Sequence, residues 1–100
     1  MKTVLTFGTF DHLHEGHKNY LMQARKYGDH VITVVARDET VFLIKGRYPH
    51  EREEQRIKRI VTSGLADEVV LGSDHDYFQI LDAYPADVIV LGYDQRSELT

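Results

Sequence analysis

The chain has 100 residues, of which 42% are apolar and 28% charged, with a formal net charge of −4 and no cysteine. This length and composition predict one folded domain with a modest core and exclude a disordered chain. The negative charge argues against the basic surface of a nucleic-acid-binding domain, and the lack of cysteine excludes disulfides and thiolate metal sites, as expected of a cytoplasmic protein.

Apolar, β-branched segments alternate with amphipathic ones along the chain. Residues 3–7, 30–36, 68–72 and 88–92 predict strands, and the longer runs are typical of strands buried on both faces. Between the first two, apolar residues at helical spacing predict a helix that begins at Asp11 or His12 and ends at Gly28. Residues 51–64 and 77–83 predict two further helices. Such alternation indicates an α/β domain with a parallel sheet and right-handed crossovers, and ligands of such sheets bind at the carboxyl ends of the strands.

No apolar run approaches the roughly 20 residues that a membrane helix needs, so we expect no membrane contact. The first apolar run is interrupted by Gly8, Asp11 and His12 before a secretory signal could form. We therefore expect an unprocessed chain.

The segment after the first predicted strand, residues 8–17, reads GTFDHLHEGH. Gly8 and Gly16 allow a ligand to approach the backbone closely, and the amino end of the following helix suits a phosphate. His14 and His17 are three residues apart, so they share one helix face and could stabilise charge that develops on a phosphate. The segment has neither the dinucleotide-binding pattern nor that of a P-loop.

A metal site is the alternative interpretation of this segment, because Asp11, His14 and His17 are all possible ligands. The spacing differs from that of H-E-x-x-H, so we predict no metal held by the protein alone. The remaining histidines, taken singly, are typical of surface residues.

A basic segment spans residues 45–59 and holds six of the 12 Lys and Arg residues. Lys45 follows the second predicted strand in what we expect to be a loop, and Arg56 lies on the next helix. Lysine suits a mobile point charge and arginine suits bidentate phosphate recognition, so both are candidates for holding an anion, with a solvated charged face as the alternative. Lys58 and Arg59 are more typical of a solvated helix face.

Residues 8–17 resemble the GTFDxxHxGH motif of the nucleotidyltransferases with HxGH active sites, in the cytidylyltransferase-like branch. The resemblance continues through ARDETV at 36–41, KGR at 45–47, EQR at 54–56, ADEV at 66–69 and LGYDQ at 91–95. ARDETV, KGR and LGYDQ are more similar to archaeal-type FAD synthases, which adenylylate FMN, than to glycerol-3-phosphate cytidylyltransferases.

The resemblance implies a Rossmann-like sheet with strand order 3-2-1-4 and helices on both faces. It also implies a reaction in which a phosphate monoester, such as FMN or glycerol 3-phosphate, attacks the α-phosphorus of ATP or CTP, with Mg²⁺ bound to the triphosphate and pyrophosphate released. The implied catalytic residues are His14, His17 and Lys45. The implied nucleotide- and phosphate-binding residues are Gly8, Thr9, Phe10, Asp11, Gly16, Arg56, Gly92 and Asp94.

The members of this family continue beyond the LGYDQ-like segment, whereas this sequence ends at Thr100. We therefore expect residues 1–100 to form a single nucleotidyltransferase domain that is incomplete at its C-terminus. The strand at 88–91 would then be an exposed apolar edge, which predicts either a homo-oligomer or a lost C-terminal segment that covered this edge. A nucleotide-binding remnant without catalysis, or a regulatory module of the same fold, is the alternative function.

Overall fold

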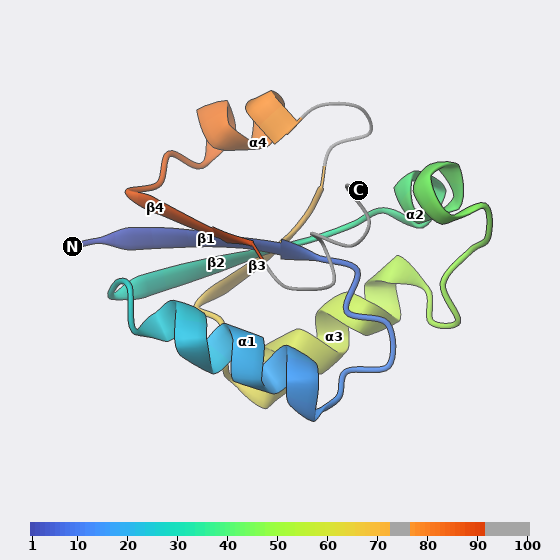
Figure 1. Ribbon diagram of the computed structural model, residues 1–100, viewed down its shortest axis with the longest axis horizontal. Coiled ribbons are helices and arrows are strands. Elements are labelled where there is room, and N and C mark those ends of the chain that lie inside the picture. The colour runs from blue at the N-terminus through green and yellow to red at the C-terminus, as the bar shows by residue number, and fades with distance from the viewer. Residues whose placement is uncertain (73–76, 92–100) are drawn as a thin grey trace.

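A computed structural model describes residues 1–72 and 77–91, and these form one four-stranded parallel sheet with helices on both faces (Figure 1). The elements are β1 (Thr3–Gly8), α1 (Glu15–Arg25), β2 (His30–Val35), α2 (Asp38–Lys45), α3 (Glu53–Ser63), β3 (Glu68–Leu71), α4 (Tyr77–Ala83) and β4 (Val88–Leu91). The strand order is β3-β2-β1-β4, which confirms the predicted topology.

The two central strands supply most of the core because their side chains alternate between two covered faces. Leu5 and Phe7 of β1 pack with Ile32 and Val34 of β2 and with Ile80 of α4. The other face of these strands packs against α1 and α3, which lie together on the opposite side of the sheet from α4 in Figure 1. The predicted burial of both faces is therefore confirmed for β1 and β2.

The structure differs from the prediction in two main ways. The first helix begins at Glu15 rather than at Asp11 or His12, because Phe10 and His12 have φ values of 56° and 50°, in the left-handed region that a right-handed helix cannot include. The second difference is α2, which the sequence analysis did not predict. Its apolar residues at 41–44 are consecutive rather than periodic, and three of them are exposed.

At the amino edge of the sheet, three aspartates link neighbouring strands, and each aspartate lies one residue before a strand. Asp29 accepts a hydrogen bond from Lys2 N, Asp67 from Val31 N and Asp87 from Thr3 N, at 3.0, 2.7 and 2.8 Å. In return, the backbone N–H of each aspartate donates to the carbonyl oxygen of its partner residue, which is Lys2, Val31 or Thr3. These reciprocal pairs fix where each strand begins relative to its neighbour.

At the opposite edge, the carboxyl ends of β1 and β2 lead into the loop before α1 and into α2 (Figure 1). This is the edge at which ligands of parallel sheets bind. Among the described residues, no helix has the length and apolar character needed to cross a membrane.

Candidate active site

The loop from β1 to α1 is anchored by the aromatic ring of Phe10. The ring is 2% exposed and lies in the core with Leu21, Val35 and Ile60. Gly8 makes this possible, because a β-carbon at that position would lie 2.7 Å from the ring. The side chain of Phe10, one of the predicted phosphate-binding residues, therefore faces the core and holds the loop in place.

His14 and His17 cap the amino end of α1 and lie face to face. The Nδ1 atom of His14 accepts from the backbone N–H of Gly16 at 3.0 Å, and Nδ1 of His17 accepts from that of His14 at 3.3 Å. Their ring centroids are 3.8 Å apart. Because both Nδ1 atoms are acceptors, the proton of each neutral ring lies on Nε2. The predicted pair is thus brought together as two Nε2–H donors at a helix amino end.

Gly16 provides the space that the His14 ring occupies. A β-carbon at Gly16 would lie 2.9 Å from Cε1 and 3.1 Å from Nδ1 of that ring. Any other residue would push the imidazole out of its capping position, so the glycine between the two histidines controls their orientation.

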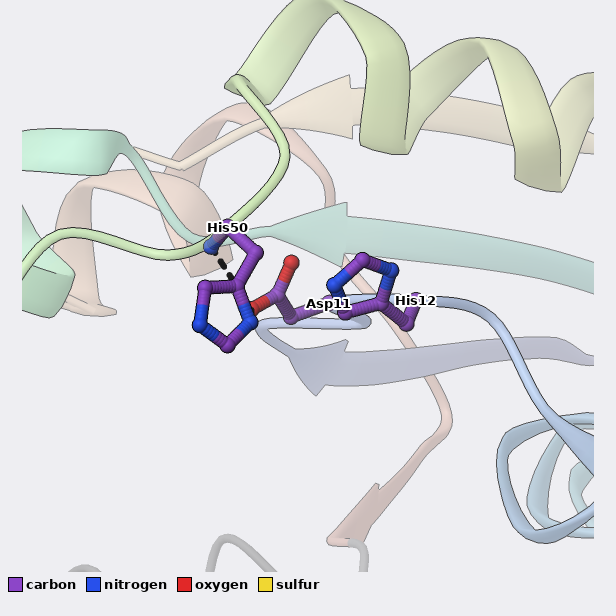
Figure 2. A group of neighbouring side chains, drawn as sticks. All are labelled: Asp11, His12 and His50. Atoms are coloured by element: carbon purple, nitrogen blue, oxygen red, sulfur yellow. Dashed lines mark hydrogen bonds and ion pairs between the residues drawn. The ribbon is translucent and has the colours of Figure 1, made fainter.

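Asp11 joins this loop to the segment before α3. Its carboxylate oxygens accept hydrogen bonds from the backbone N–H groups of His50 and Glu51, both at 2.9 Å, and Figure 2 shows the first of these. Burial raises the pKa of Asp11, but these two bonds outweigh it, so the pKa lies below its ordinary value. Asp11 is therefore ionised at neutral pH.

Arg56 lies in a different environment from the one predicted. Its side chain has no exposed area, and its guanidinium donates to Glu51 O at 3.0 Å, to Thr9 O at 2.8 Å and to Asp38 Oδ1 at 2.6 Å. The protein itself thus provides partners for this group, away from solvent. Arg56 therefore positions the loop at Thr9, a role that the sequence analysis did not assign to it, while its contact with a phosphate stays a prediction.

Lys45 is the last residue of α2 and not a loop residue, and Gly46 ends the helix with φ of 76°. Lys45 lines a small pocket of about 50 Å³ together with Thr9, Asp11, Arg47 and His50. Two cationic side chains beside the loop of the predicted motif suit an anionic ligand. The predicted residues Thr9, Asp11 and Lys45 are therefore brought together.

The sequence analysis missed two acidic residues of this region, Glu51 and Asp38. Glu51 is 5% exposed, accepts from His12 N at 2.9 Å and pairs with Arg59. Asp38 Oδ2 accepts from Glu53 N, while Glu53 Oε1 accepts from Asp38 N at 2.8 Å, so the starts of α2 and α3 hold each other. Glu51 left one signal, as an acidic residue that interrupts the basic segment, whereas Asp38 lies outside that segment. Gly92 and Asp94, also predicted site residues, lie outside the described residues.

Comparison with known proteins agrees with this geometry. The family model described as cytidylyltransferase-like matches residues 5–99. This chain belongs to the cytidylyltransferase-like family. The predicted family is therefore confirmed.

Relatives within the cytidylyltransferase-like family include FAD synthases of methanogens. The FAD synthase of Methanosarcina barkeri is 44% identical over 96% of this chain and 68% of its own length. That of Methanococcoides burtonii is 46% identical over 95% of this chain and 65% of its own length. A solved structure, the lipopolysaccharide core biosynthesis protein from Thermoplasma volcanium, matches with a TM-score of 0.90 and 37% identity over 99% of this chain and 83% of that one. Across the four FAD synthases compared, the chain spans 62 to 68% of the relative's length.

Cytidylyltransferase-like nucleotidyltransferases typically use a divalent metal. Among the residues that the structure describes, Asp11 offers a carboxylate that suits a hard cation, and it lines the pocket that contains Lys45 and Arg47. Each of its oxygens accepts one backbone hydrogen bond and keeps a second lone pair. The donor set therefore fits a cation that is held mainly by the phosphates of a bound nucleotide.

Proposed function

We propose that this chain carries the site of an FMN adenylyltransferase, which transfers AMP from ATP to FMN and releases pyrophosphate. The observation that carries the proposal is the pair of Nε2–H donors that His14 and His17 form at the amino end of α1. The names of the relatives, FAD synthases at 43 to 46% identity, favour FMN over other acceptors.

The chemistry needs no nucleophile from the protein. A phosphate oxygen of FMN forms a bond to the α-phosphorus of ATP, and the bond from that phosphorus to the oxygen bridging to the β-phosphate breaks. Negative charge grows on the leaving pyrophosphate and on the α-phosphate oxygens. Two imidazole donors and the positive end of the α1 dipole stabilise that charge, while Lys45 and the pocket beside Thr9 hold the phosphates in line.

Mg²⁺ is the divalent metal of this proposal, because it binds triphosphate oxygens and needs few protein ligands. Asp11 is the residue that would hold it. When bound, Mg²⁺ neutralises part of the charge of the triphosphate. The cytoplasmic location expected from the sequence belongs to the same proposal.

The test is a matrix of pyrophosphate release, with ATP and CTP each offered to FMN and to glycerol 3-phosphate. We expect release with ATP and FMN only. Release with CTP and glycerol 3-phosphate would identify a cytidylyltransferase instead. Nucleotide binding by calorimetry without any release would indicate the non-catalytic remnant, and no binding would indicate a regulatory module.

A homo-oligomer formed along β4 is part of the proposal. Within the described residues β4 pairs only with β1, and its side chains Ile89 and Leu91 are 46% and 49% exposed. An apolar strand edge of this kind favours pairing with a second copy. Light scattering over a range of concentrations should give a dimer mass that Ile89→Lys reduces to that of the monomer, and a monomer at all concentrations would contradict it.

A further inference from the structure

The candidate active site shares Asp11 with a cluster whose two histidines, His12 and His50, have no role in the proposed function. Asp11, His12 and His50 lie together in Figure 2, with the carboxylate of Asp11 between the two imidazoles. One ligand atom from each residue lies within 4.8 Å of the others. We propose that these three residues form a binding site for a transition-metal dication of the Zn²⁺ type.

The backbone of each ligand is already fixed in place. The backbone N–H of His50 is bound to Asp11, and the backbone N–H of His12 is bound to the buried Glu51 at 2.9 Å. The site thus connects two loops 39 residues apart in sequence, and these loops are held together without a metal. Little conformational entropy is lost when a metal binds to backbones that are already ordered.

The side chains keep the freedom that coordination needs. Both imidazoles are exposed, with centroids 5.1 Å apart, and Nδ1 of His50 lies 3.7 Å from Asp11 Oδ2. In a tetrahedral zinc site neighbouring ligand atoms are about 3.3 Å apart, so rotation of the two rings closes the remaining distance.

The ligand set selects the class of cation. Two imidazole nitrogens and one carboxylate oxygen suit Zn²⁺ and similar metals, whereas Mg²⁺ prefers oxygen ligands alone. Three protein ligands leave a fourth position for water or an anion. Asp11 and His50 also line the pocket that contains Lys45 and Arg47, so that fourth position would adjoin the anion-binding groups.

The test is calorimetric titration of the full chain with Zn²⁺, in the presence of millimolar Mg²⁺. We expect one Zn²⁺ per chain. His12→Asn and His50→Asn should each weaken its affinity by about 10-fold or more, since even partners outside the first ligand shell contribute 10- to 100-fold. Asparagine tolerates the left-handed backbone at His12, so this variant keeps the loop intact. His30→Asn, at the amino end of β2, is the control that should keep full affinity.

Thermal unfolding gives a second readout that does not depend on catalysis. Zn²⁺ should raise the Tm of the natural chain and of His30→Asn, but not that of the two ligand variants. The proposal is overturned if the natural chain binds no Zn²⁺, or if Mg²⁺ displaces it. It is equally overturned if the two variants bind as tightly as the natural chain while His17→Asn loses binding, because the stacked pair at α1 would then be the ligand. All of these outcomes are independent of whether FMN is adenylylated.

Discussion

His14 and His17 combine two roles, since the same rings cap α1 and carry the donors of the candidate active site. Replacing His14 by alanine would remove both roles at once. Asparagine is a good capping residue and separates them. We predict that His14→Asn lowers kcat for pyrophosphate release by on the order of 100-fold while the free energy of unfolding stays within about 1 kcal/mol of the natural value.

Urea unfolding and steady-state kinetics measure the two effects. His14→Ala serves as the comparison, with the same loss of kcat and an additional loss of stability of about 1 kcal/mol. Full turnover in His14→Asn would remove this histidine from the reaction.

Gly16 gives a prediction in which activity falls while stability is retained. Gly16→Ala places a methyl group where the His14 ring lies, and the flexible ring is what must move. Alanine inside a helix is more favourable than glycine by up to about 1 kcal/mol. Because this gain offsets the lost His14 cap, we expect Gly16→Ala to be about as stable as the natural chain, with a reduced kcat. Unchanged turnover would show that the ring position seen here is not required.

At the scale of elements, Arg56 holds three segments together: the loop at Thr9, the start of α2 at Asp38 and the carbonyl of Glu51. Arg56→Met keeps the aliphatic length but leaves the Asp38 carboxylate and two carbonyl oxygens without this partner. We predict a loss of about 3 kcal/mol in the free energy of unfolding, as for other broken buried ion pairs. Arg52→Met, at an exposed arginine of the same segment, should cost about 0.5 kcal/mol or less. Equal urea midpoints for the two variants would show that Arg56 does not hold these segments together.

The same elements show what the sequence can and cannot predict. Continuous apolar runs identified the strands, since burial on both faces leaves a signal in consecutive residues. The start of α1 and the existence of α2 were missed, because left-handed residues such as His12 and exposed apolar residues such as Leu43 break the usual periodicity. The spacing of His14 and His17 predicted that they lie together, and the structure brings their rings face to face. The burial of Arg56 was not predicted, because a buried arginine and a phosphate-binding arginine have the same sequence pattern.

At the scale of the whole molecule, the two edges of the sheet differ. The candidate site lies at the carboxyl edge, and the hydrogen bonds between each aspartate and its backbone partner lie at the amino edge. Asp67 also accepts a hydrogen bond from Arg25 of α1 at 2.6 Å, and this bond, with that from Val31, lowers its pKa. The stability that Asp67 contributes is therefore fully present above its unfolded pKa, about 3.9, and is lost as pH falls through the lower folded value.

We predict that Asp67→Asn lowers the free energy of unfolding by about 1 kcal/mol at pH 7, a modest figure because both partners are more than a third exposed. The difference from the natural chain should disappear as pH is lowered below the unfolded pKa. Asp82→Asn, at an exposed residue of α4, is the control that makes the same substitution away from this edge of the sheet. Urea unfolding across pH measures both, and a constant difference at all pH values would contradict the assignment. Neither variant should change kcat.

The reciprocal aspartate pairs also bear on how the chain finds its alignment during folding. Side chains alternate along a strand, so a shift of one residue would exchange the side chains that β2 presents to the two covered faces of the sheet. Asp29, Asp67 and Asp87 each bind one particular residue that lies in an adjacent strand or directly before it, through both backbone and carboxylate. A misaligned strand would lose both bonds together. Each aspartate thus sets the register of the strand that follows it. An insertion of one residue between Asp29 and Val31 should therefore destabilise the fold far more than an insertion in the loop after Gly64.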